Sequence, residues 1–214
     1  MDAEALIGCA WSQIRDGAYS YAVEAPAPEA YGTAVGLYAH AAWEVRFFAV
    51  IVLGHIAASD RRALEFLYAR CGEDGSWQVN EGLAMAFDAY CAARGYDQAL
   101  PEIELWLHAP QPNLRRAVSE GLRPWTAKAR PYFAAKPQAA IDLLGSLIDD
   151  ESRYVLESTG NALRDISRKH FELVLAALRV WLAEQPRSRS RRVMARCALE
   201  RAVKTDPSLR QLYE

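Results

Sequence analysis

Three acidic side chains, Glu81, Glu120 and Asp165, stand at related places in successive copies of a repeated pattern. Counted from the apolar residue that opens each copy, they fall at offsets 2, 6 and 10, which lie one turn apart on one face of a helix. Carboxylates gathered on one surface can stabilise a cationic transition state or activate a water molecule, as the cleavage of a glycosidic bond requires. The same acids are also compatible with a solvated surface or with a docking surface for a basic peptide.

Other polar and aromatic residues accompany these acids on the same predicted face. Arg116, Arg123 and Asn161 lie among them, where they are candidates for contacts to a bound ligand. Trp77 and Trp43 occupy matching positions at the starts of two predicted helices. Such tryptophans serve either as packing anchors or as stacking platforms.

A block of basic residues lies near the carboxyl end of the sequence. Residues 187–204 contain seven basic residues against the single acid Glu200. Four of the arginines come close together: Arg187, Arg189, Arg191 and Arg192. A block of this kind is either a solvated helix face or an element that contacts phosphate groups.

The elements that position these residues follow from a repeat. Four segments superpose when they are aligned on Val45, Val79, Leu114 and Val155, with spacings of 34, 35 and 41 residues, and a weaker copy begins 38 residues later at Val193. In the four stronger segments, the residues at offsets 0, 3, 4, 7 and 8 are apolar or small, which is the stripe of an amphipathic helix. This period is typical of paired-helix solenoids.

The sequence therefore predicts an all-α fold, a HEAT-like helical-repeat solenoid that forms one curved domain over residues 1–214. The second helix of each pair is expected near 43–57, 76–92, 112–124, 152–168 and 188–204. Amphipathic partner helices are expected at 61–70, 97–108, 137–148 and 171–184, with turn residues between them.

Composition limits the classes of protein to which the chain can belong. The hydrophobic content of 51% suffices for a sizeable core, and no apolar stretch is long enough to cross a bilayer. Asp2 and Glu4 stand where an export signal would carry positive charge, so we expect a cytoplasmic protein. The four cysteines form no C-x-x-C pair, so we expect reduced thiols and no metal site.

Three stretches resemble the AlkC and AlkD family of HEAT-like-repeat DNA glycosylases, and the AlkC branch more closely. Residues 113–124, NLRRAVSEGLRP, resemble the R-R-x-x-S-E-G-x-R-P motif of the AlkC branch. Residues 152–170 are similar to the Y-V-R-x-S-V-x-N-x-L-x-D-I-x-K-x-H pattern of that branch, and residues 77–81, WQVNE, to the W-x-x-x-D turn of the AlkD branch. The likeness extends over about residues 40–205.

The resemblance implies an enzyme that excises cationic N3- and N7-alkylated purines from duplex DNA by hydrolysing the N-glycosidic bond, without a metal or cofactor. We expect the protein to be a monomer. The resemblance also implies that Glu81, Glu120 and Asp165 are the catalytic carboxylates and that Trp77 lines the site. On this reading we expect the DNA to be contacted by Arg116, Arg123, Asn161, Arg187, Arg189, Arg191 and Arg192. Leu156 stands where the AlkC pattern has arginine. Because some members of the family lack glycosylase activity, a non-catalytic module that binds DNA or a protein is the alternative.

Overall fold

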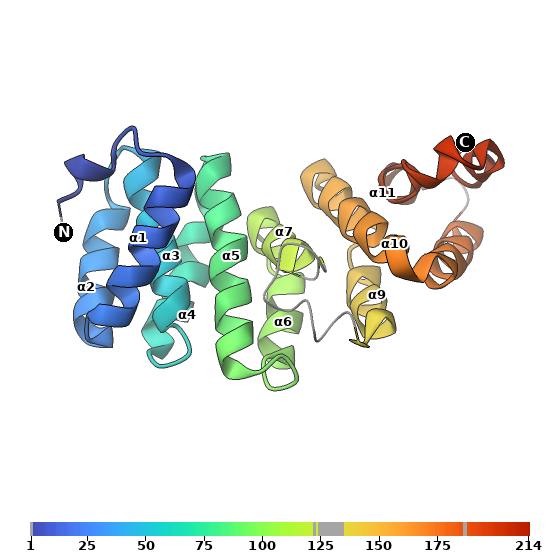
Figure 1. Cartoon of the computed structure of the whole chain (residues 1–214). Coiled ribbons are helices and arrows are strands. Elements are labelled where there is room, and N and C mark those ends of the chain that lie inside the picture. The colour runs from blue at the N-terminus through green and yellow to red at the C-terminus, as the bar shows by residue number, and fades with distance from the viewer. Residues whose placement is uncertain (1, 122, 124–134, 186–187) are drawn as a thin grey trace. The chain divides into compact units, whose positions relative to one another are not determined.

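The described part of the chain is built from helices (Figure 1). The computed structural model describes residues 2–121, 123, 135–185 and 188–214, and no strand occurs in these ranges, which confirms the predicted all-α class. Pro124, which is expected in a helix, and Arg187, which belongs to the basic block, lie outside the described residues. The α-helices are α1 (Trp11–Glu24), α2 (Ala27–Tyr38), α3 (Trp43–Ile56), α4 (Arg61–Arg70), α5 (Trp77–Arg94), α6 (Leu100–Leu107), α7 (Pro112–Gly121), α9 (Pro137–Gly145), α10 (Arg153–Glu184) and α11 (Arg189–Leu199).

The helix positions follow the sequence repeat closely. The predicted partner helix at residues 61–70 is α4, and the predicted helix near 76–92 is α5. Two predicted helices, 152–168 and 171–184, are joined in α10, which has a kink at His170, where φ is −132° and ψ is 49°. A helix pair is thus connected here through one non-helical residue, without a loop.

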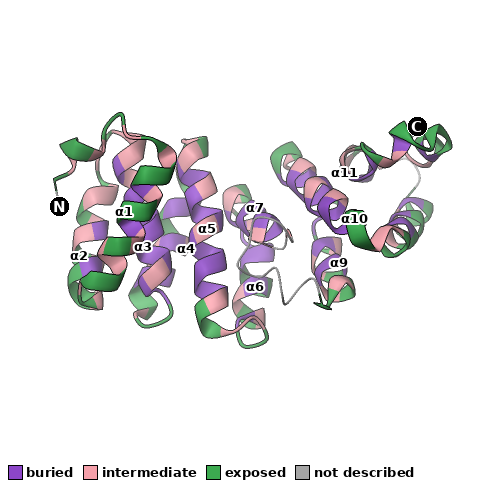
Figure 2. Ribbon diagram, in the orientation of Figure 1, coloured by how far each residue is buried: buried purple, intermediate pink, exposed green. Residues whose placement is uncertain are grey.

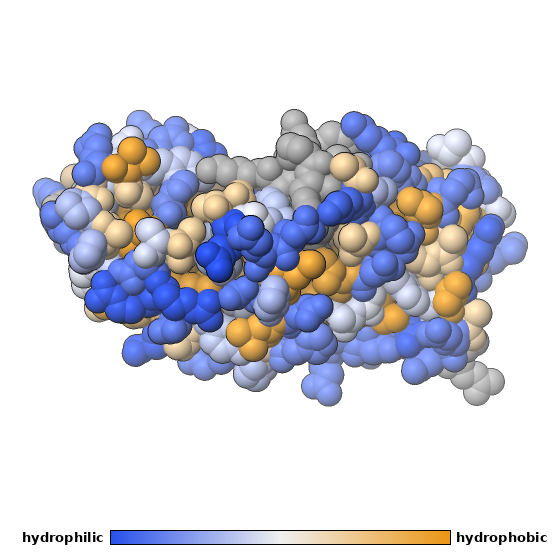
Figure 3. Space-filling view, turned by 90° about the horizontal axis from the view of Figure 1, so that it is seen from below, coloured by the Kyte–Doolittle hydropathy of each residue, from blue (hydrophilic) through white to orange (hydrophobic). Residues whose placement is uncertain are grey.

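The chain divides into two compact units, Met1–Pro101 and Glu102–Glu214, and the single domain expected from the sequence stays a prediction. None of the described helices is long and apolar enough to span a lipid bilayer. The face drawn in Figure 3 carries mainly hydrophilic described residues, and the hydrophobic ones lie in small groups. The described residues on that face therefore show no broad apolar patch of the kind that marks a protein interface.

In the first unit, α3 is the central helix and packs against α1, α2, α4 and α5. It is buried on almost every side (Figure 2), as expected of a helix that is hydrophobic all round. The prediction that offsets 2 and 6 lie on a free face is wrong in this repeat, because Phe47 and Ile51 are at most 1% exposed. The reason is that α1 covers this face, where the rings of Trp11 and Phe47 stack with centroids 5.0 Å apart.

Two glycines allow helices to approach closely. A Cβ atom at Gly54 in α3 would lie 2.3 Å from the Cα of Ala86 in α5, inside the contact limit of backbone atoms. In the second unit, α10 packs against α7, α9 and α11. There a Cβ at Gly160 would lie 2.5 Å from the Cβ of Cys197 in α11. Glycine at these positions lets the paired backbones meet.

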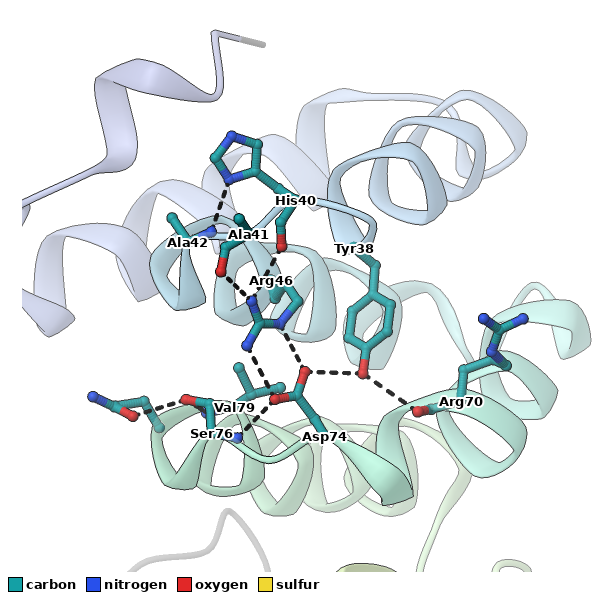
Figure 4. A network of polar contacts seen from close by, with 10 residues as sticks. Tyr38, His40, Ala41, Ala42, Arg46, Arg70, Asp74, Ser76 and Val79 are labelled. Atoms are coloured by element: carbon teal, nitrogen blue, oxygen red, sulfur yellow. Dashed lines mark hydrogen bonds and ion pairs between the residues drawn. The ribbon is translucent and has the colours of Figure 1, made fainter.

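A polar clamp ties Arg46, at the start of α3, to the connection before α5 (Figure 4). Arg46 Nε donates to Asp74 Oδ2 at 2.8 Å and Nη2 donates to Oδ1 at 3.2 Å, while Nη1 donates to the carbonyl of Ala41 at 2.6 Å. Asp74 Oδ1 also accepts the backbone N–H of Ser76 at 2.8 Å, and Ser76 is the N-cap of α5. One ion pair therefore fixes the start of two helices.

The second unit repeats this clamp with the same atoms. Arg115 Nε donates to Asp150 Oδ2 at 2.6 Å and Nη2 donates to Oδ1 at 2.9 Å, while Nη1 donates to the carbonyl of Ala109 at 2.7 Å. Asp150 Oδ1 accepts the N–H of Ser152 at 2.8 Å, and Ser152 precedes α10. Arg46 and Arg115 each follow the apolar residue that opens a copy of the sequence repeat, so the structure repeats where the sequence does.

The first clamp predicts a pH-dependent stability. Burial opposes ionisation of Asp74, but its bonds to Arg46, Ser76 and Tyr38 lower the pKa of the carboxyl below its ordinary value of 3.8. A lowered pKa in the folded state stabilises the protein above the ordinary value, and this contribution is lost as the pH falls through the folded-state pKa. We expect Asp74→Asn to lower the free energy of unfolding at pH 7 by about 1–3 kcal/mol and by less below about pH 4.

Urea unfolding of the parent and Asp74→Asn proteins at a series of pH values measures this difference. A difference that stays constant from pH 7 to pH 3 would contradict an ionic contribution from Asp74.

Candidate functional site

Glu120 and Asp165 come together in the second unit through Arg123. Glu120 lies near the end of α7 and Asp165 in the first half of α10. Arg123 Nη1 donates to Glu120 Oε2 at 2.6 Å, and its Nε donates to Asp165 Oδ2 at 2.9 Å. We call these three residues and their direct polar neighbours the carboxylate cluster.

Two buried hydroxyl groups extend the cluster. Ser158 Oγ donates to Glu120 Oε1 at 2.7 Å. Ser119 Oγ lies 2.6 Å from Ser158 Oγ and 2.9 Å from the carbonyl oxygen of Arg116. Ser158 falls in an apolar stripe of the sequence repeat, and the repeat gives Ser119 no role. Small polar residues inside such a stripe are the signal that could have revealed a buried polar network.

Two further arginines approach the carboxylates. Arg116 Nη2 lies 3.5 Å from Glu120 Oε1, and its guanidinium carbon lies 4.6 Å from the ring centroid of Tyr154. Arg168 Nη2 lies 3.6 Å from Asp165 Oδ1. Burial favours the neutral form of Arg123, but the charges and hydrogen bonds of Glu120 and Asp165 outweigh it and raise the pKa of Arg123. The cluster thus holds two carboxylates among three guanidinium groups.

The burial of these acids differs from the expectation of an exposed helix face. Glu120 is 8% exposed and Asp165 is 3% exposed. The physical reason is that α7 packs against α10, so the face that bears the acids is a packing surface. Buried carboxylates need charged or hydrogen-bonding partners, and Arg123 and Ser158 supply them. Arg116 and Arg123, expected to contact DNA, are partners of the acids in this structure.

Glu81 and Trp77 belong to the other unit. Trp77 is the first residue of α5 and is 63% exposed, and its ring centroid lies 6.3 Å from that of Trp11. Glu81 is half-buried one turn further along α5. The structure thus brings Glu120 and Asp165 together, and the association of Glu81 with them stays a prediction.

The basic block divides between two environments. Arg191 is buried, and its guanidinium binds Asp149 at 2.6 Å and Glu184 at 3.0 Å. It therefore ties α11 to these two acids and is not available for a contact with a phosphate group. Arg189 and Arg192 line a hollow of about 710 Å³ beside α11, which we call the basic hollow. Asn161 lines a neighbouring hollow of about 500 Å³ between α10 and α11. Arg187 lies outside the described residues.

The described part of the chain contains neither a candidate metal site nor a disulfide bond. The residues that the structure describes contain no group of three or more His, Cys, Asp or Glu side chains that could hold a metal ion. The four cysteines are free thiols, and Cys71 and Cys91 are buried. Burial raises the pKa of the Cys71 thiol, so this thiol is a packing group rather than a reactive thiolate.

Comparison with known proteins identifies the family. The sequence model of a family described as DNA alkylation repair enzyme matches residues 2–205 of the chain. The protein belongs to this family. The matched range contains the carboxylate cluster, Glu81 and Trp77, and the arginines of α11, so every described candidate residue lies within the part of the chain that the family model matches.

Known structures and sequences of relatives support this assignment. AlkD2 from Streptococcus mutans is 35% identical and has a TM-score of 0.84, with 92% of each chain covered. The protein smu.31 from Streptococcus mutans UA159 is also 35% identical, with a TM-score of 0.81 over 87% of this chain and 90% of that chain. These matches confirm the HEAT-like helical repeat. The closer likeness to the AlkC branch stays a prediction.

A curated relative matches a shorter segment. The uncharacterised protein YhaZ of Bacillus subtilis strain 168 is 31% identical over 93 residues, which are 42% of this chain and 26% of YhaZ. The match therefore spans about a quarter of that relative's length.

Proposed function

We propose that the protein is a DNA glycosylase that excises cationic N3- or N7-alkylated purines from duplex DNA. The observation that carries this proposal is the pair of buried carboxylates, Glu120 and Asp165, that α7 and α10 bring into one cluster in a chain of the alkylation repair family. The resemblance of the surrounding motifs to the AlkC branch supports it. We further propose that the enzyme acts in the cytoplasm as a monomer and needs no cofactor.

The proposed reaction is a hydrolysis. The N-glycosidic bond breaks with its electron pair on the purine, which cancels the positive charge of the alkylated base. The oxygen of a water molecule bonds to C1′ of the deoxyribose, and a proton of that water passes to solvent. Positive charge develops on the sugar in the transition state, so ionised carboxylates nearby lower the barrier.

The two carboxylates are held differently within the cluster. Glu120 has both oxygens engaged at hydrogen-bond distance, by Arg123 at 2.6 Å and by Ser158 at 2.7 Å. Asp165 Oδ2 binds Arg123 at 2.9 Å, whereas Oδ1 has an ion-pair contact with Arg168 at 3.6 Å. Arg168 is 45% exposed at its side chain, so the cluster reaches solvent on this side. We therefore assign Asp165 Oδ1 to the sugar cation or the attacking water, and Glu120 to the support of Arg123.

Release of free base from methylated DNA tests the proposal. Methylated duplex DNA is incubated with the protein, and 3-methyladenine and 7-methylguanine are measured against a boiled control. Release above the control supports a glycosylase. DNA binding without release from any alkylated duplex would favour the alternative, a non-catalytic DNA-binding module.

Substitution of Glu81 tests whether the first unit contributes to catalysis. Glu81 is half-buried on α5, so we expect Glu81→Gln to change the free energy of unfolding by less than about 1 kcal/mol. If its charge stabilises the transition state, excision should fall by about 10²- to 10³-fold while DNA binding is kept. The measurements are single-turnover excision and urea unfolding.

Glu44→Gln is the matched control for Glu81→Gln. Glu44 is another half-buried acid of the same unit, in the first turn of α3, and its substitution should leave excision unchanged. Full activity of Glu81→Gln would remove Glu81 from the site.

A further inference from the structure

Two serines beside the acids of the carboxylate cluster are buried and take no direct part in the proposed hydrolysis. Ser119 of α7 is 0% exposed and Ser158 of α10 is 3% exposed, so bulk solvent does not reach their hydroxyl groups. The two hydroxyl oxygens lie 2.6 Å apart, although the residues are 39 positions apart in the sequence. Because buried hydroxyl groups need hydrogen-bond partners, the partners of these two show what the pair can do.

The number of hydroxyl protons limits the bonds that the serine pair can form. Ser119 Oγ lies 2.6 Å from Ser158 Oγ and 2.9 Å from the carbonyl oxygen of Arg116. Ser158 Oγ lies 2.7 Å from Glu120 Oε1. An ionised carboxylate and a carbonyl group only accept hydrogen bonds, whereas each serine has one proton to donate. Two protons therefore serve three contacts, so at most two of these contacts are full hydrogen bonds.

The two shortest contacts give the serine pair a direction. Because the proton of Ser158 goes to Glu120, the contact between the two serines is a hydrogen bond only when Ser119 donates to Ser158. The Ser119 proton is then not available to the carbonyl of Arg116. The hydrogen bonds run from Ser119 through Ser158 to Glu120, and in such a chain each bond strengthens the next. We call this arrangement the hydroxyl chain.

The hydroxyl chain is connected to Asp165 through Glu120 and Arg123. Glu120 Oε2 accepts a bond from Arg123 Nη1 at 2.6 Å, and Arg123 Nε donates to Asp165 Oδ2 at 2.9 Å. Arg116 Nη2 lies 3.5 Å from Glu120 Oε1, which is longer than a well-formed N–H···O hydrogen bond. Ser158 therefore makes the shorter of these two contacts to Oε1 and restrains the carboxylate on the side opposite Arg123.

We propose that Ser158 is a positioning residue of the carboxylate cluster and that Ser119 supports it. The inference rests on the proposed function for the reaction that is assisted. Ser158 fixes the orientation of the Glu120 carboxylate, which in turn holds the guanidinium of Arg123. Arg123 binds Asp165 Oδ2, which leaves Oδ1 directed at the sugar or the attacking water. Because a displacement of about 1 Å at a reacting group can cost about 10² in rate, these hydroxyl groups control the rate without touching the substrate.

The test compares two variants that each remove one buried hydroxyl group from α10. Ser158→Ala removes the donor to Glu120 with little change in side-chain size. Thr159→Val is the matched control, because Thr159 is the next residue, is 0% exposed, and donates at 2.9 Å to the carbonyl of Val155 in its own helix. Only Ser158→Ala breaks the hydroxyl chain at Glu120. Ser119→Ala is a second variant that breaks the chain one step earlier.

The first measurement does not depend on activity. In protein isotopically labelled at its arginine nitrogens, the NMR signal of the Arg123 Nε–H group, assigned by its loss in Arg123→Lys, reports on the bond from Arg123 to Asp165. We expect Ser158→Ala to speed the exchange of this proton with solvent by about tenfold. Ser119→Ala should speed it less, and Thr159→Val should keep the parental rate. A parental rate in Ser158→Ala, or an unprotected Arg123 Nε–H in the parent protein, would overturn the inference.

The second measurement is single-turnover excision from methylated duplex DNA over a range of protein concentrations. We expect Ser158→Ala to lower the maximal rate by about 3- to 10-fold and to leave the half-saturating concentration unchanged. In a Glu120→Gln background, Ser158→Ala should cause no further loss, because it acts through Glu120. A purely structural role predicts that the two losses multiply, and that result would overturn the inference. Parent protein that releases no base, but whose Arg123 signal responds to Ser158→Ala, would refute the glycosylase and leave the positioning of Arg123 standing.

Discussion

Asp165→Asn is expected to lower the rate of base excision by about 10²- to 10³-fold, the scale seen when one preorganised electrostatic group is removed. Glu120→Gln is expected to lower the rate by less, because Glu120 acts through its support of Arg123. Both should also lower the free energy of unfolding, by about 2–4 kcal/mol, because each replaces a buried carboxylate and leaves the half-buried Arg123 with one charged partner fewer. Single-turnover excision at 25 °C and urea unfolding measure the two effects separately. An acid on an open surface would show the first effect without the second.

Asp150→Asn separates loss of catalysis from loss of stability. Asp150 is also a buried carboxylate of the second unit that pairs with an arginine, Arg115, but it lies in the clamp and not in the carboxylate cluster. We expect a comparable loss of stability, with excision retained at temperatures where the variant is folded. If Asp150→Asn loses as much activity as Asp165→Asn, the acids of the cluster are structural and the assignment of Asp165 to the reaction is refuted.

Gly54→Ala is expected to be the most destabilising single-methyl change in the first unit. The added Cβ would lie 2.3 Å from Ala86 Cα, 2.5 Å from its Cβ and 2.8 Å from its carbonyl oxygen. These atoms belong to the backbone or are fixed to it, so α3 and α5 must separate to make room. Overpacking of this kind costs about 1–3 kcal/mol or more, which urea unfolding would measure.

Gly36→Ala in α2 is the matched control. Each glycine lies two residues before the last residue of its helix, but no atom lies within 4 Å of a Cβ built at Gly36. Because alanine favours the helix over glycine, we expect Gly36→Ala to stabilise the protein by up to about 1 kcal/mol. Equal effects of the two substitutions would show that α3 and α5 do not meet at Gly54.

The helices could be predicted from the sequence because each copy of the repeat marks where a helix begins and ends. The residues that open the four stronger copies, such as Val45 and Leu114, are completely buried, as the apolar stripe indicated. The end of one helix near residue 168 and the start of the next at Phe171 were also visible, and the kink at His170 lies between them.

The environment of the candidate site was harder to predict. The pattern treated offsets 2, 6 and 10 as a face open to solvent, but it contains no information on which helices cover that face. The pairing of Glu120 with Arg123, three residues later, is local and could have been read as a helix pair. The second partner of Arg123, Asp165, is 42 residues away, and only the packing of α7 on α10 brings it there.

The basic block shows the same limit. Composition identified an excess of positive charge, but the orientation of α11 decides what each arginine does. Arg191 faces Asp149 and becomes structural, while Arg189 and Arg192 face the hollow. A helical wheel separates these two groups, and only the position of Asp149 shows which group faces inward.

The repeated arginine–aspartate clamps have a consequence for how the chain folds during synthesis. Arg46 and Asp74 are 28 residues apart, and Arg115 and Asp150 are 35 residues apart, so both partners of each clamp have been synthesised once the following repeat has begun. Contacts of such short sequence separation favour rapid folding, and domains and repeats can fold progressively from the amino-terminal end. Each newly made helix pair can thus form its arginine–aspartate clamp with the preceding pair before the following pair has left the ribosome. The apolar face of the new pair is then exposed to other nascent chains for a shorter time.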